Sequence, residues 1–186
     1  MRVKDQLHGV FTPFEESVWN PYAQLLGVSS KYVILLTEDV EEDRFVFLEA
    51  VKRAGLCNPV RMVNDGREAI GYISGEFFYA DRERFPFPTA LMLDLKLPRT
   101  SGWEVLEWVR ARREFARLLV VVLTASEYIP DLEKAYRMGA NSFLTKPCRS
   151  EDLRNLATTF PEHFGPLVMM GRPQSGPGTI ISRPAS

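Results

Sequence analysis

The stretch Thr89-Ala-Leu-Met-Leu-Asp-Leu-Lys-Leu-Pro98 decides the fold, because a short apolar run leads directly into a carboxylate and then into a proline. Residues 90–93 are apolar at every position, which is typical of a central parallel strand buried between two layers of helices. Such a strand delivers Asp94 to the carboxyl edge of the sheet, where doubly wound α/β folds keep their binding sites. Asp94 is therefore the first candidate for a functional side chain.

Three further apolar runs end in polar side chains that suit the same site. These side chains are Glu38 and Asp39 after residues 32–37, Thr124 after residues 119–123, and Lys146, followed by Pro147, after residues 142–145. Any one of them alone could be a helix cap, the end of a strand or a surface residue. Together, three carboxylates, a hydroxyl and an ammonium at one sheet edge predict a small site for a divalent cation and a phosphoryl group. Mg²⁺ is the natural candidate, because it accepts carboxylates and completes its shell with phosphate oxygens and water.

From residue 32 onward, short apolar runs alternate with amphipathic stretches, which predicts repeated βα units and a parallel sheet. The expected strands lie near 32–37, 59–64, 89–94, 119–124 and 141–145, and the expected helices near 42–54, 66–79, 102–114, 130–138 and 150–159. Ser101 and Glu104 form a capping box before the third helix, and Ser150 precedes an acidic first turn of the fifth. Gly55 and Gly139 are expected to end the first and fourth helices.

Length and composition predict one domain with extensions. The chain has 186 residues and a formal net charge of −1, which gives no general electrostatic attraction to nucleic acid or to an anionic membrane. Cys57 and Cys148 belong to no Cys-x-x-Cys pair, which argues against a disulfide framework or a zinc site and favours the cytoplasm. The sequence shows no signal-peptide pattern and no run of membrane-spanning length.

Two aromatic segments lie outside the repeated pattern. Residues 75–88 form a long, aromatic-rich connection, interpreted either as a loop folded over the core or as an exposed contact surface for a partner. Residues 1–30 are too apolar for a disordered tail and are expected to pack on the domain or on another subunit. Because this is more aromatic surface than one small core needs, we expect the chain to form a homodimer. The Pro-, Gly- and Ser-rich end is expected to be flexible.

A resemblance to a known family rests on residues in a fixed order: Glu38-Asp39, Asp94 with Leu97-Pro98 and Gly102, Thr124-Ala125, and Lys146-Pro147. Together they closely resemble the receiver domain of two-component response regulators, over about residues 31–160, leaving 1–30 as an N-terminal extension and 161–186 as a C-terminal tail. With the longer segment before the third strand and the stretches 95–99, 121–125 and 139–147, the chain looks most like stand-alone receivers that serve cyanobacterial and bacterial phytochrome kinases. The resemblance implies an α/β, flavodoxin-like, doubly wound five-stranded parallel sheet of order 2-1-3-4-5, with helices on both faces.

By this resemblance Asp94 is the phosphoacceptor, and Thr124 and Lys146 bind the phosphoryl group. Asp39, Asp94 and the backbone carbonyl of Lys96 bind Mg²⁺, with Glu38 helping through a water. Phe143 matches the aromatic position whose side chain follows Thr124 inward on activation.

Two features depart from the family pattern or bear on the lifetime of the phosphorylated form. Glu38 stands where an aspartate is more usual. Lys96 and Ser126 occupy positions that modulate phosphoryl lifetime in the family.

The resulting hypothesis is a single-domain response regulator of a phosphorelay. It accepts a phosphoryl group from a sensor histidine kinase, for which the resemblance suggests the phytochrome type, and signals through a changed surface of residues 130–159. It is a phosphoacceptor that catalyses at most its own phosphorylation and dephosphorylation, and its downstream protein target is not named by the sequence. One rival is a phosphorylation-independent binding module. Another is a haloacid-dehalogenase-like phosphohydrolase, which would need an aspartate where Lys96 stands.

Overall fold

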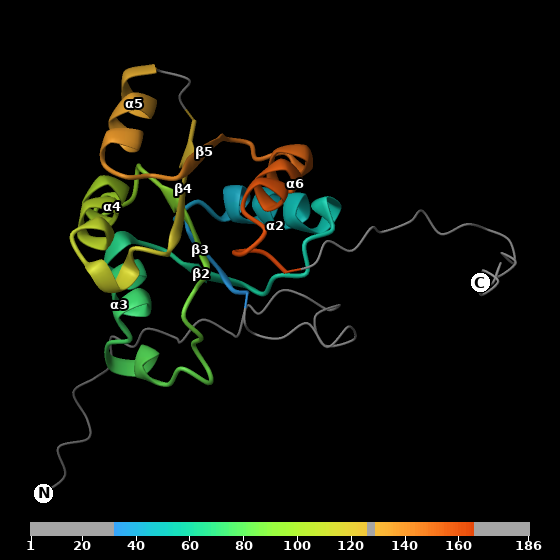
Figure 1. Ribbon diagram of the computed structural model, residues 1–186. Coiled ribbons are helices and arrows are strands. Elements are labelled where there is room, and N and C mark those ends of the chain that lie inside the picture. The colour runs from blue at the N-terminus through green and yellow to red at the C-terminus, as the bar shows by residue number, and fades with distance from the viewer. Residues whose placement is uncertain (1–31, 126–128, 166–186) are drawn as a thin grey trace, which may run out of the picture.

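The structure is a computed structural model that describes residues 32–125 and 129–165, with only the backbone of Ile129 (Figure 1). The expected N-terminal extension, Ser126 and most of the expected tail lie outside the described residues. The packed chain continues beyond the expected boundary at residue 160, because Phe164 is buried in the core and the backbone N–H of Gly165 donates to the side chain of Asn58 over 3.4 Å.

One five-stranded sheet forms the centre of the molecule, and its strands are parallel. The strands are β1 (Ile34–Thr37), β2 (Val60–Val63), β3 (Ala90–Asp94), β4 (Leu119–Thr124) and β5 (Ser142–Thr145). Their order in the sheet is β2-β1-β3-β4-β5. The prediction of a doubly wound parallel sheet of order 2-1-3-4-5 is confirmed. The order makes β1 and β3 neighbours, and the residues that follow them therefore meet.

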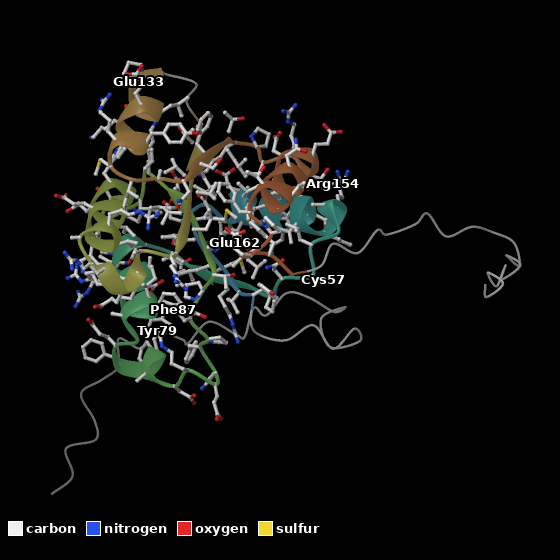
Figure 2. All side chains as sticks on the ribbon, viewed as in Figure 1. Cys57, Tyr79, Phe87, Glu133, Arg154 and Glu162 are labelled. Atoms are coloured by element: carbon white, nitrogen blue, oxygen red, sulfur yellow. The ribbon has the colours of Figure 1, made fainter. Side chains whose placement is uncertain are left out.

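Helices cover both faces of this sheet (Figure 1). On one face lie α2 (Glu41–Ala54) and α6 (Ser150–Thr159); on the other lie α3 (Gly66–Ser74), α4 (Gly102–Arg110) and α5 (Ile129–Arg137). Figure 2 labels Arg154 on α6, whose guanidinium donates to the carbonyl oxygens of Arg53 and Ala54 at the end of α2. Within the described ranges, no helix is both long enough and apolar enough to span a bilayer.

The strand that decides the fold is buried on both sides. Met92 packs with the core cluster beneath α2 and α6, whereas Leu91 and Leu93 pack with the cluster beneath α3, α4 and α5. All three side chains have no exposed surface. This is the physical reason why the run shows no alternation of apolar and polar residues, since neither face of a doubly covered strand meets water.

The helix ends differ from the expectation in two places. The helix expected over 66–79 ends at Ser74, because Gly75 takes the left-handed conformation with φ of 74°. The helix expected over 102–114 ends at Arg110 and gives way to a 3-10 turn, Arg113–Phe115. The helix expected over 150–159 is found as α6, Ser150–Thr159, with Glu151 and Asp152 in its first turn.

The other helix signals were read correctly. Ser101 and Glu104 form the predicted capping box at the start of α4. Gly55 and Gly139 have φ angles of 75° and 94° and follow α2 and α5, as expected of glycines that end helices.

The aromatic connection after α3 contains both a packed and an exposed part. Its 3-10 helix, Phe77–Ala80, places Tyr79 against Tyr72 of α3 at a ring distance of 5.1 Å, and Phe85 completes the cluster. Phe78 packs edge-on against Tyr79, with ring centres 5.6 Å apart, but Phe77 and Phe78 remain 84% and 66% exposed. Figure 2 shows Tyr79 and Phe87 at the same end of the molecule. The segment is therefore folded over the core in part, as the first interpretation expects, and exposed in part; a partner contact at the exposed rings stays a prediction.

Candidate functional site

The structure brings the three predicted carboxylates together at the ends of β1 and β3. Glu38, Asp39 and Asp94 each offer an oxygen, and these oxygens all lie within 4.8 Å of one another. Thr37 pairs with Leu93 across the two strands, so the residues after them project from the same point of the sheet edge. Glu38 and Asp94 are buried and Asp39 is exposed, which makes a site with a closed floor and an open rim.

The loop after β3 folds tightly around Asp94. The backbone N–H of Lys96 donates to Asp94 Oδ1 over 2.9 Å, and the N–H of Gly102 donates to the carbonyl oxygen of Leu95 over 3.1 Å. A side chain at Gly102 would overlap the backbone oxygen of Asp94, so the start of α4 can approach this closely only as glycine. The loop thus holds the Asp94 carboxylate in place through backbone groups.

Lys146 enters the site from β5. Its backbone N–H donates to the carbonyl oxygen of Thr124 over 2.8 Å, and a cis peptide bond joins it to Pro147. Its ammonium lies 2.5 Å from Asp94 Oδ2 and 2.5 Å from Glu38 Oε2. Thr124 is buried at the end of β4, the strand that lies between β3 and β5.

The pKa values of Glu38 and Lys146 are shifted by burial and by the charges that lie close to each of them. Burial raises the pKa of Glu38, and this effect exceeds the opposing hydrogen bond from Lys146. For Lys146, burial alone would lower the pKa, but the hydrogen bonds to Asp94 and Glu38 outweigh it and the pKa is raised. The lysine is therefore a fixed positive charge in the physiological range, held by the carboxylates around it.

The donor set fits a hard divalent cation. Three carboxylate groups at one point supply the oxygen ligands that Mg²⁺ and Mn²⁺ prefer. The exposed position of Asp39 leaves one side open to water and to an incoming anion. A small cavity beside Lys146, lined also by Glu38 and Asp43, has a volume of about 10 Å³, which is about the space of one water molecule.

The predicted switch residue lies near the site but outside the carboxylate cluster. Phe143 of β5 is half-buried and packs edge-on against Tyr136 of α5, with ring centres 5.8 Å apart. Tyr136 is itself half exposed. A change in the side chain of Phe143 would therefore alter the exposed surface of α5.

Sequence reasoning missed Asp43, which belongs to the site. Its carboxylate lies 3.1 Å from the Lys146 ammonium and comes from the first turn of α2. Three acids stand in that turn, namely Glu41, Glu42 and Asp43, and the sequence alone could not say which one faces the site. The signal that could have singled out Asp43 is its position four residues after Asp39. The direction of the Asp43 side chain follows, however, only when the first residue of α2 is known to be Glu41.

Two arginines that tie neighbouring loops to the site were also missed. Arg44 donates to the carbonyl oxygen of Asp39 over 3.2 Å and to the side chain of Asn64 over 2.6 Å, which joins the loops after β1 and β2. Arg99 adopts a positive φ of 64° and pairs with the buried Asp65, which caps α3. The contacts of Arg44 with Asn64 and of Arg99 with Asp65 link segments far apart in sequence, and no local pattern could have revealed them.

The comparisons with known proteins agree with this geometry. The response regulator receiver domain profile matches residues 34–158. The chain belongs to the response regulator receiver domain family. It is 33% identical over 121 residues to the response regulator Rcp1 of Synechocystis, covering 65% of this chain and 80% of Rcp1. It is 31% identical over 140 residues to the probable methanogenesis regulatory protein FilR2 of Methanothrix harundinacea, covering 75% of this chain and 88% of FilR2.

Solved receiver structures extend the likeness to phytochrome-associated regulators. The bacteriophytochrome response regulator AtBRR is 33% identical with a TM-score of 0.65, covering 75% of this chain and 99% of AtBRR. The phosphorylated cyanobacterial phytochrome response regulator RcpA is 30% identical with a TM-score of 0.59, covering 70% and 91%. The Mn²⁺-bound form of Rcp1 is 30% identical with a TM-score of 0.58, covering 70% and 92%. Receivers bind Mg²⁺ or Mn²⁺ in an acidic pocket, and phosphorylation-dependent signalling is the role of the family.

Proposed function

We propose that this receiver takes a phosphoryl group onto the carboxylate of Asp94 and that Lys146 and Thr124 hold the transferred group. The observation that carries the proposal is the Lys146 ammonium, 2.5 Å from Asp94 Oδ2 at the open edge of the sheet. The phosphoryl group leaves a nitrogen of the donor's phosphohistidine, and an oxygen–phosphorus bond to Asp94 replaces the nitrogen–phosphorus bond. Lys146 then contacts an oxygen of the new group and Thr124 contacts another.

We assign the metal site to Mg²⁺ in the cell. Asp39 and Asp94 would supply carboxylate ligands, the backbone carbonyl of Lys96 a third ligand, and Glu38 would act through a water. The bound cation would supply positive charge that neutralises the carboxylates and the incoming phosphoryl oxygens. This assignment is supported by the carboxylates of Glu38, Asp39 and Asp94, which each place an oxygen within 4.8 Å of the other two.

The readout is a changed surface of α5, β5 and α6. Thr124 ends β4, and Phe143 lies in β5 opposite Val122, so a movement of Thr124 toward the phosphoryl group frees space into which Phe143 can turn. Phe143 would then leave its contact with Tyr136. This is a local charge event that biases a two-state surface.

The partner that donates the phosphoryl group is a sensor histidine kinase, and the phytochrome-associated relatives support a kinase of phytochrome type. Acting with such a kinase, the protein would work in the cytoplasm, which suits the two buried free thiols of Cys57 and Cys148. A second copy of the chain is a further proposed partner, supported by the exposed rings of Phe77 and Phe78.

The test of the proposed function is modification of a single carboxylate. Full-length protein is incubated with Mg²⁺ and acetyl phosphate, and the phosphorylated fraction is measured by intact mass. Wild type and Asp152→Ala, which removes a carboxylate that pairs with Arg149 on the surface, should both gain one phosphoryl group. Asp94→Ala should gain none, and equal modification of Asp94→Ala would refute the assignment.

A further inference from the structure

The ammonium of Lys146 has three hydrogen-bond donors, and three different carboxylates accept from it. Asp94 Oδ2 and Glu38 Oε2 each lie 2.5 Å from the nitrogen, and Asp43 Oδ2 lies 3.1 Å from it. A lysine ammonium has no further donor to offer. With all three partners in place, Lys146 is fully engaged before any phosphoryl group arrives.

The three partners are not equivalent. Glu38 and Asp94 belong to the carboxylate cluster that fits the metal, whereas Asp43 stands outside that cluster. Asp43 is also at the rim, with 40% of its side chain exposed, whereas Glu38 is almost completely buried at 1%. When a cation binds at Glu38 and Asp94, it competes with the Lys146 ammonium for these two carboxylates. Asp43 is then the one of the three partners for which the cation does not compete.

From this arrangement we infer that Asp43 is a positioning residue that holds Lys146 at the rim of the site and sets the balance between metal and phosphoryl binding. The inference rests on the proposed function, in which Asp94 receives the phosphoryl group beside a metal ion. Asp43 draws the ammonium away from the two metal-facing carboxylates, which favours the cation. Its own negative charge at the rim repels the phosphoryl oxygens, which disfavours the bound phosphoryl group.

The same residue therefore acts with opposite sign on the two ligands. Without its charge, Lys146 would bind Glu38 and Asp94 more firmly and compete harder with the metal. In saturating metal, the ammonium would instead be free to bind a phosphoryl oxygen without a competing carboxylate. A residue that only stabilised the start of α2 could not weaken one ligand and strengthen the other.

The neighbouring acids provide a matched control. Glu42 lies in the same first turn of α2 and is exposed, and within the described part of the chain it takes part in no ion pair with Lys146. Glu42→Gln removes the same charge from the same helix end as Asp43→Asn does. It therefore separates the contact with Lys146 from the general effect of charge near the N-terminus of a helix.

The experiment measures two affinities on the full-length chain. Mg²⁺ is titrated against the fluorescence of Trp103, and beryllofluoride is then titrated in saturating Mg²⁺, with amide spectra as the readout. Asp43→Asn should weaken Mg²⁺ about threefold or more and tighten beryllofluoride by a similar factor. Glu42→Gln should change either affinity by less than about twofold. Asp43→Asn affinities that match those of Glu42→Gln, or that shift in the same direction, would overturn the inference.

A second measurement asks whether Asp43 acts through Lys146. In the Lys146→Ala background, Asp43→Asn should lose at least half of its effect on Mg²⁺ affinity, on a logarithmic scale, because the contact is already gone. An undiminished effect would mean that Asp43 acts through space, and the positioning role would be wrong. Failure of the wild type to bind Mg²⁺ or beryllofluoride at all would instead contradict the proposed function, so the two failures are distinguishable.

Discussion

The backbone N–H of Lys146 donates a 2.8 Å hydrogen bond to the carbonyl oxygen of Thr124, which fixes the ends of β4 and β5 relative to each other. The two residues proposed to hold the phosphoryl group are thus joined through their backbones. Their side chains can be changed without removing this bond. Substitutions at Lys146 and Thr124 therefore test the chemistry of the site separately from its framework.

Lys146→Ala should keep Mg²⁺ binding but lose the beryllofluoride-driven change in amide spectra of β5 and α6. Removing a positive charge from among carboxylates should tighten Mg²⁺ by about threefold or more. Without Mg²⁺ the variant should lose about 2 to 4 kcal/mol of stability, because the buried Glu38 and Asp94 lose their counter-ion. Denaturant unfolding with and without Mg²⁺ measures this loss, with Lys52→Ala, a surface ion-pair residue, as the control. A variant that still responds to beryllofluoride would make Lys146 a structural residue only.

Asp39→Ala should weaken Mg²⁺ binding more than Glu38→Ala does. Asp39 is exposed at the open rim and can meet the cation directly, whereas the Glu38 carboxylate is occupied by Lys146 and by the backbone N–H of Val40. Titration of Mg²⁺ against Trp103 fluorescence compares the two variants. The reverse order of affinities would show that Glu38 is the direct ligand and that Asp39 acts at a distance.

Gly102→Ala should destabilise the protein and weaken Mg²⁺ binding together. A Cβ at this position would overlap the backbone oxygen of Asp94, and moving that backbone would displace the carboxylate. The expected cost is about 1 to 3 kcal/mol in free energy of unfolding. Gly71→Ala is the matched control, because its Cβ would make only ordinary contact with Tyr79 and should stabilise α3 by about 0.5 to 1 kcal/mol. If Gly102→Ala bound Mg²⁺ with unchanged affinity, the close packing of Gly102 on the Asp94 backbone would have no role in holding the metal site.

The sequence predicted the fold and the central part of the site for a definite physical reason. A buried parallel strand such as β3 carries an unbroken apolar run, and the polar residue that ends it must emerge at the sheet edge. The positions of Asp94, Glu38 and Lys146 follow from that rule. Asp43 and Arg44 could not be found in the same way, because their contacts depend on where α2 begins and which way its first turn faces. The early end of α3 was missed because Gly75 precedes further aromatic residues that resemble a continuing helix.

The last prediction concerns self-association through the aromatic connection after α3. Phe77 and Phe78 are exposed by 84% and 66%, and burying such rings is the main gain when protein surfaces associate. Phe77→Ser with Phe78→Ser should shift full-length protein from dimer to monomer in light scattering at tens of micromolar. Phe45→Ser, which removes a ring exposed by 66% on α2, should leave the dimer intact.

A stable interface buries about 1,200 to 2,000 Å² in total, which is more than two rings supply, so neighbouring surface must contribute. Removing residues 1–28, whose sequence is rich in aromatic and aliphatic side chains, should therefore also weaken the dimer. Ending the chain at Met170 should not weaken the dimer, because the residues that it removes, 171–186, include few apolar side chains. A full-length protein that is monomeric at this concentration, with and without beryllofluoride, would mean that the exposed rings serve another purpose than self-association.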